Sequence, residues 1–135
     1  MIDLKKYEEF VDAVTSQESK DYISFNSRCF NIQTGEDGVP IERLLTAALG
    51  MSAEAGEFTE IIKKIVFQGK PVNDENLFHL KRELGDVMWY VMQACMGLNI
   101  SLEEVIEMNV DKLKARYPGG EFDVHYSENR KEGDL

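Results

Sequence analysis

Cysteine and positive charge are both scarce in this sequence, and each shortage excludes a class of protein. The two cysteines, Cys29 and Cys95, lie far apart and in no metal-binding spacing, so we expect free thiols in a reducing compartment rather than a disulfide framework or a zinc site. The formal net charge is -10. That charge disfavours a protein that lies along nucleic acid, because such binding neutralises phosphates with lysine and arginine.

Long apolar runs are missing as well. The longest stretch without a charged residue, Val87–Leu102, contains Gln93 and Asn99 and is short for a membrane span. The N-terminal sequence MIDLKKYEEF carries too many charges for a signal peptide. We therefore expect a cytoplasmic protein that has neither membranes nor nucleic acid among its partners.

The apolar residues that are present follow helical spacing, and we find no strand pattern, low-complexity tract or long linker. Helices are predicted over Asp3–Ser16, Ile41–Phe67, Glu75–Leu98 with Asp74 as its cap, and from a capping box at Ser101 and Glu104 to about Tyr117. The pattern over Lys20–Asn31 is ambiguous and allows a second helix. A loop is predicted over Thr34–Pro40, and an irregular tail over 119–135. The fold expected is all-α, a bundle of four or five helices in a single domain over 1–135 with its core at about 41–118.

The predicted helix around Trp89 is hydrophobic on nearly every side. A helix of this kind must be covered all round, and a domain this small has difficulty doing so alone. We therefore expect a homodimer or homotetramer that associates through its helices.

Two short segments share the same beginning. EAGEFTEIIKK, from Glu54, and ELGDVMWYV, from Glu83, each start with an acid, an apolar residue, a glycine and a second acid. Residues three apart share a helix face, so Glu54 projects with Glu57, and Glu83 projects with Asp86. Both pairs lie on or beside the apolar stripe of helices expected to be antiparallel neighbours. Buried carboxylates are costly unless they are paired or bind a metal, and clustered oxygen ligands suit Mg²⁺ or Mn²⁺.

The two glycines within these segments raise a second question. Gly56 and Gly85 each cost about 1 kcal/mol relative to alanine in a helix interior. We expect them to let the two acidic helices, or a ligand, approach closely. The alternative is a helix-packing role with no metal, since acidic pairs of this spacing are weak evidence by themselves: Glu9 and Asp12 have it too.

Side chains suited to phosphate follow on the last predicted helix. The sequence NVDKLKARYP sets Asn109, Lys112 and Arg116 on one helix face. Lysine and arginine near a metal site bind phosphate oxygens, and arginine does so with two parallel hydrogen bonds. The alternative is a solvated basic face on an acidic protein.

Other candidate residues allow two interpretations each. Lys64 is a second possible phosphate ligand, or an ordinary helical partner of Glu60 four residues before it. Tyr90 is either a stacking surface for a base or part of the core. The histidines, His79 and His125, do not form the Glu-x-x-His motif of di-iron bundles, which favours a redox-inert cation.

Taken together, these segments resemble the MazG-like nucleoside triphosphate pyrophosphohydrolases, an all-α superfamily that also includes dimeric dUTPases and dCTPases. The family pattern of Glu-x-x-Glu, a spacer and Glu-x-x-Asp is met by Glu54, Glu57, Glu83 and Asp86. The similarity covers roughly Leu44–Pro118, and the two ends of the chain are similar to short MazG proteins of cyanobacterial bacteriophages. One departure is Ala53, which stands where many family members have another acid.

The resemblance implies hydrolysis of a nucleoside triphosphate, deoxy or non-standard, to the monophosphate and pyrophosphate, in the host cytoplasm if a phage encodes the chain. It implies that the four carboxylates hold Mg²⁺ and act in catalysis, with Glu83 as a ligand or the general base. It also implies that Asn109, Lys112 and Arg116, with Lys64, steady the phosphates and that Tyr90 contacts the nucleoside. Two alternatives remain: a (p)ppGpp alarmone hydrolase that uses the same site, and a non-enzymatic helical interaction module.

Overall fold

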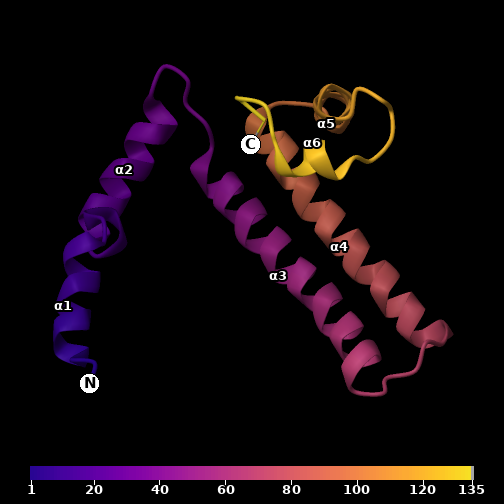
Figure 1. Cartoon of the computed structure of the whole chain (residues 1–135). Coiled ribbons are helices and arrows are strands. Elements are labelled where there is room, and N and C mark those ends of the chain that lie inside the picture. The colour runs from indigo at the N-terminus through magenta and orange to yellow at the C-terminus, as the bar shows by residue number, and fades with distance from the viewer. Residues whose placement is uncertain (135) are drawn as a thin grey trace.

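The computed structural model describes residues 1–134, and all of its regular secondary structure over that range is helical (Figure 1). Its elements are α1 (Leu4–Val14), the short 3-10 helix η1 (Gln17–Ser19), α2 (Tyr22–Thr34), α3 (Ile41–Phe67), α4 (Asp74–Leu98), α5 (Leu102–Arg116) and α6 (Val124–Glu128). The all-α prediction is confirmed. Among the described residues, none of these helices is both long and apolar enough to cross a membrane.

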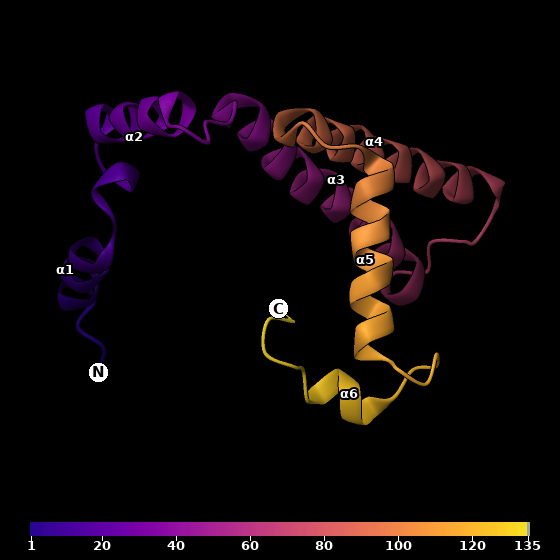
Figure 2. The same cartoon turned by 90° about the horizontal axis from the view of Figure 1, so that it is seen from above.

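The two longest helices, α3 and α4, run antiparallel and form the centre of the molecule (Figures 1 and 2). The arm made of α1, η1 and α2 stands to one side of this hairpin. At the other end, α5 leads away from α4, and the tail with α6 folds back near the far end of α5 (Figure 2). The α3–α4 hairpin therefore supplies most of the tertiary packing within one chain.

The turn between α3 and α4 explains where both helices end. After α3, Gly69 has φ +69°, and the Lys70 N–H donates to the Lys64 carbonyl at 3.1 Å. The predicted cap of α4 was wrong by one residue, because Asn73 rather than Asp74 accepts a hydrogen bond from the Asn76 N–H, at 2.9 Å. Asp74 instead lies in the first turn of α4, where a carboxylate is favoured by the helix dipole.

A buried amide fixes this turn to the start of α4. The Asn76 side chain is only 5% exposed, and its Nδ2 donates to the Pro71 carbonyl at 2.7 Å. A buried polar group needs such a partner, since leaving it unpaired costs about 1–3 kcal/mol. Asn76 thus helps to set how α4 folds back along α3.

Close approach of the two helices depends on glycines other than the two that the sequence suggested. A Cβ at Gly50 would overlap the Tyr90 ring, and one at Gly97 would lie 2.8 Å from Leu44 Cδ2. Around Gly56 and Gly85, by contrast, a Cβ would meet nothing within 4 Å among the described residues. Within one chain, the expectation that Gly56 and Gly85 let the two helices approach closely is therefore wrong, and the expectation that they let a ligand approach stays a prediction.

Outside the α3–α4 hairpin, some elements agree with the sequence prediction and others differ. The ambiguous segment after η1 is helix α2, which Asp21 caps by accepting from the Ser24 N–H at 2.9 Å. The cap at Ser101 is confirmed, because its hydroxyl accepts from the Glu104 N–H at 3.0 Å. The tail, predicted to be irregular, contains the short helix α6, capped by Asp123.

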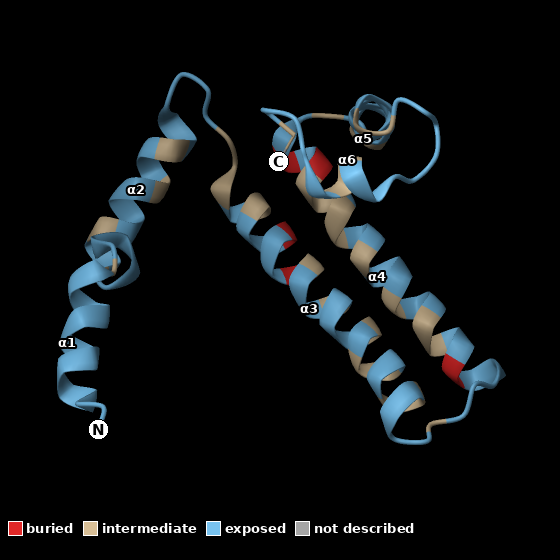
Figure 3. Ribbon diagram, in the orientation of Figure 1, coloured by how far each residue is buried: buried red, intermediate tan, exposed pale blue. Residues whose placement is uncertain are grey.

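Most side chains of the isolated chain remain exposed to solvent (Figure 3). Among the described residues, the buried apolar ones are Ala47 and Cys95, both on the α3–α4 hairpin. Large apolar side chains such as Trp89 and Met96 on α4 are 56% and 58% exposed. One chain does not cover these surfaces, which agrees with the expected oligomer, although the oligomeric state stays a prediction.

Candidate functional site

Three carboxylates meet across the middle of the α3–α4 hairpin. Glu54 comes from α3, and Glu83 and Asp86 come from α4; one carboxylate oxygen from each lies within 4.8 Å of the other two. The antiparallel pairing of the helices brings these residues together from positions far apart in the sequence. Glu54 and Glu83 are half-buried and Asp86 is exposed, so the group is open to a ligand from one side. We call these three residues the acidic cluster.

Mutual repulsion and partial burial both act on Glu54. Loss of water around its carboxyl is the largest cause that raises the pKa of Glu54, followed by the negative charges of Asp86, Glu57 and Glu83. Hydrogen bonding with the nearby Glu83 side chain, which only the protonated form of one carboxyl can donate, is the smallest cause that raises the pKa of Glu54. All these causes raise the pKa of Glu54, because no cation within residues 1–134 lowers it. A bound cation would relieve this repulsion and favour the charged form of each ligand.

The chemistry of the cluster suits a hard divalent cation. Oxygen ligands without histidine or cysteine are typical of Mg²⁺ and Mn²⁺ sites, and Mg²⁺ is usually held by one or two carboxylates together with substrate phosphates. Glu57 is exposed and lies outside the group of oxygens that are mutually close, yet its charge reaches Glu54. The sequence thus predicted three members of the cluster, and Glu57 as a fourth ligand remains a prediction.

Lys64 points to a neighbour on its own helix. Its ammonium lies 3.3 Å from a Glu60 carboxylate oxygen, and the Lys63 ammonium lies 2.6 Å from the other oxygen. The hydrogen bonds from these two lysines lower the pKa of Glu60. The helical pair expected as the alternative is therefore present, and a role for Lys64 in binding phosphate remains a prediction.

Tyr90 belongs to the packing between α3 and α4. Its ring occupies the space left by Gly50 and meets the Trp89 ring edge-on, with centroids 4.9 Å apart and an interplanar angle of 88°. Trp89 is the more exposed of the two aromatic residues. The ring of Tyr90 is half-buried, and its contact with a nucleoside stays a prediction.

The three polar residues predicted on α5 do share one face. Asn109, Lys112 and Arg116 line a cavity of about 500 Å³ between α5 and the tail. Because α5 leads away from the hairpin, one chain presents them as a group separate from the acidic cluster (Figure 2). The structure thus places these three residues on one wall of a cavity, and the tail forms the other wall.

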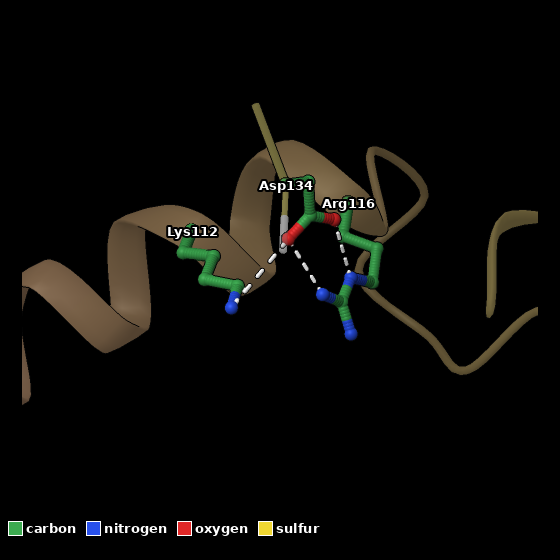
Figure 4. Close-up of polar contacts among 3 residues, drawn as sticks. All are labelled: Lys112, Arg116 and Asp134. Atoms are coloured by element: carbon green, nitrogen blue, oxygen red, sulfur yellow. Dashed lines mark hydrogen bonds and ion pairs between the residues drawn. The ribbon is translucent and has the colours of Figure 1, made fainter. Parts of the chain in front are cut away.

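Sequence reasoning missed Asp134, which also lines this cavity. Asp134 accepts two hydrogen bonds from Arg116, Nε to Oδ2 and Nη2 to Oδ1, both at 2.6 Å (Figure 4). The Lys112 ammonium lies 3.6 Å from Oδ1 of the same carboxylate. Asp134 is 18 residues from Arg116 and belongs to no motif, so no local pattern could have indicated the contact.

Comparison with known proteins places the acidic cluster and the predicted α5 residues within one matched domain. Residues 42–120 match the MazG nucleotide pyrophosphohydrolase domain. A curated relative, the Gene 37 protein of Mycobacterium phage L5, is 41% identical over 81 residues, which is 59% of this chain and 71% of that protein. No solved structure was found to match the chain significantly. MazG-type enzymes generally use divalent metals, and the cluster formed by Glu54, Glu83 and Asp86 lies inside the matched residues. The chain therefore belongs to the MazG nucleotide pyrophosphohydrolase family.

Proposed function

We propose that this chain is a Mg²⁺-dependent enzyme that hydrolyses (deoxy)nucleoside triphosphates to the monophosphate and pyrophosphate. The observation that carries the proposal is the acidic cluster on the α3–α4 hairpin. Its oxygens converge within 4.8 Å, its members lie in the MazG-matched residues, and partial burial, followed by repulsion from neighbouring acids, raises the pKa of Glu54. An uncompensated group of this kind is costly to keep unless it serves to bind a cation.

The roles of the acids follow from their positions. Glu54 and Asp86 hold the cation, Glu83 is a third ligand or the general base, and Glu57 one turn along α3 joins the ligands when substrate is present. When bound, Mg²⁺ supplies positive charge against the phosphate oxygens and acidifies water. Glu83, half-buried beside Glu54, is our candidate for the base that accepts the proton of the attacking water. The water oxygen then forms a bond to the α-phosphorus, while the bond from this phosphorus to the oxygen that bridges to the β-phosphorus breaks. Pyrophosphate leaves with that bridging oxygen.

The phosphates and the nucleoside need side chains beyond the cluster. We assign Asn109, Lys112 and Arg116 to the phosphates because lysine and arginine donate charged hydrogen bonds to such oxygens. Lys64 supplements them if it leaves Glu60, and Tyr90 borders the nucleoside. In one chain, the α5 residues lie apart from the acidic cluster. We therefore propose that the chain forms a homodimer or homotetramer, in which α5 of one chain approaches the acidic cluster of another.

A substrate panel tests the proposal. Purified protein is incubated with Mg²⁺ and with each of the common dNTPs, NTPs and (p)ppGpp, and release of pyrophosphate is measured. The same panel is run with Glu54→Gln and with Glu9→Gln, which makes the same charge change on exposed α1. We expect Glu54→Gln to reduce turnover by at least about a hundredfold, because loss of a ligand misplaces the reacting atoms, and Glu9→Gln to be unaffected.

The panel also separates the alternatives. Activity on (p)ppGpp alone would show that the chain is an alarmone hydrolase that uses the same site, and not a nucleoside triphosphate pyrophosphohydrolase. No activity on any compound, together with a melting temperature that Mg²⁺ does not raise, would leave a non-enzymatic helical module as the better description.

A further inference from the structure

The contact between Asp134 and α5 stands out from the other ion pairs of the protein. The side chains of Arg116 and Asp134 are 13% and 14% exposed, whereas every other ion-paired side chain among residues 1–134, Lys112 included, is at least 30% exposed. The contact uses two parallel hydrogen bonds of 2.6 Å, the geometry in which arginine binds carboxylate or phosphate most specifically. Surface ion pairs contribute little unless their geometry is of this kind.

A turn in the tail positions the carboxylate of Asp134 beside α5. The Asp134 N–H donates to the Lys131 carbonyl at 3.0 Å, which closes a turn, and Gly133 within it has φ +86°, a conformation that glycine adopts without strain. The turn, residues 131–134, forms one wall of the cavity whose other wall is Met108, Asn109, Lys112, Ala115 and Arg116. The carboxylate thus reaches the cationic end of that cavity.

The tail also lies outside the part of the chain shared with the family. The MazG match ends at residue 120, so Lys112 and Arg116 belong to the matched domain, and Asp134 does not. A residue outside the common domain therefore occupies the side chains that our proposed function assigns to substrate phosphate. Its carboxylate presents two oxygens to the Arg116 fork as a phosphate would.

We propose that Asp134 is an internal competitor of the nucleotide phosphates and that the turn 131–134 acts as an autoinhibitory latch on Arg116 and Lys112. This inference rests on the proposed role of those two residues in binding phosphate. With the latch closed, a phosphate must displace Asp134 before it can bind. The apparent affinity for substrate is then reduced by the fraction of molecules in which the latch is open.

Steady-state kinetics with the best substrate of the panel test the latch. Asp134→Asn keeps the size of the side chain and removes its charge, and Asp134→Ala removes both. We expect KM to fall roughly three- to tenfold in both variants, because a bidentate pair that is largely shielded from solvent contributes more than an exposed pair does, with kcat unchanged. Glu128→Gln, an exposed residue of α6 with the same charge change, should leave KM unaltered.

Other results would overturn the latch. If Asp134 merely held Arg116 in place for the substrate, its removal would raise KM, and if the contact had no bearing on binding, KM would not move. A rise or no change in both variants therefore rejects the proposal, while the hydrolysis measured in the same assay leaves the proposed function standing.

A titration with inorganic pyrophosphate in the absence of Mg²⁺ keeps the two proposals distinguishable. Calorimetry reports binding of this anion to the cations whether or not the protein hydrolyses any nucleotide. We expect Asp134→Asn to bind pyrophosphate more tightly than wild type by the same three- to tenfold, roughly, and Arg116→Gln to abolish the difference. Equal affinities for wild type and Asp134→Asn would refute the latch. Tighter binding without any nucleotide hydrolysis would keep the latch and reject the proposed function.

Discussion

Burial and repulsion act together on Glu54. It lies half-buried on α3, and three neighbouring acids from two helices raise its pKa. Evolution could remove this cost by a single change to glutamine, which has the same size. Our proposal that Glu54 binds a cation accounts for the presence of the acid.

This argument predicts opposite effects of Glu54→Gln with and without metal. In the metal-free protein at neutral pH the variant should be as stable as wild type or more so, because one of the repelling charges is gone. Mg²⁺ should raise the melting temperature of wild type and have much less effect on the variant. Thermal unfolding in chelator and in Mg²⁺ measures both, with Glu9→Gln as the control. A variant that Mg²⁺ stabilises as much as wild type would exclude Glu54 as a ligand.

At the scale of elements, local signals predicted the helices well. The bounds of α3 agree with the prediction because the helical apolar period stops at Phe67 and Gly69 follows. The cap of α4 was misplaced because Asn73 and Asp74 are both good capping residues, and only the structure shows which one accepts the hydrogen bond. The short helix α6 has too few residues for a periodic pattern to reveal it.

The candidate site was predictable to the extent that it depends on helix faces. Spacing placed Glu54, Glu83 and Asp86 on faces that an antiparallel pair brings together. Spacing could not tell that Glu57 would lie outside the cluster, since that depends on how the helices are rotated against each other. The contact of Asp134 was beyond prediction because it is set by how the tail folds back on α5.

The same rotation decides which glycines matter for packing. Gly50→Ala should destabilise the protein, because the added methyl meets the Tyr90 ring and overpacking costs about 1–3 kcal/mol, more than the propensity gain of about 1 kcal/mol. Gly56→Ala is the matched control on the same helix: its methyl meets open space, so stability within one chain should rise by up to about 1 kcal/mol. Urea midpoints of the two variants compare them. Equal or greater stability of Gly50→Ala would show that the contact with Tyr90 does not constrain α3 and α4.

At the scale of the whole molecule, one chain leaves too much apolar surface uncovered. The hairpin buries Ala47 and Cys95 together with two glycines, and large side chains of α1, α2 and α4 face solvent. Exposed apolar area of this extent marks interaction surfaces. The net charge of -10 works against both compaction and association, so apolar contacts must outweigh this repulsion within each chain and between chains.

We therefore predict that folding and assembly are coupled. Sedimentation at micromolar concentration should show a homodimer or homotetramer, and dilution should reduce helix content as well as mass, because obligate oligomers often have no stable folded monomer. Circular dichroism over the same dilution series measures the helix content. A monomer that sediments as a single species and remains fully helical would contradict this prediction.

The most direct test of the central claim is to identify the products by phosphorus NMR. The protein is incubated with Mg²⁺ and a deoxynucleoside triphosphate from the panel, and the spectra are followed over time. We predict that monophosphate and pyrophosphate signals grow together in equal amounts, that both grow at least about a hundredfold more slowly with Glu54→Gln, and that neither appears in chelator. Release of inorganic phosphate with a nucleoside diphosphate, or turnover that continues without metal, would contradict a pyrophosphohydrolase that works through the carboxylates of α3 and α4.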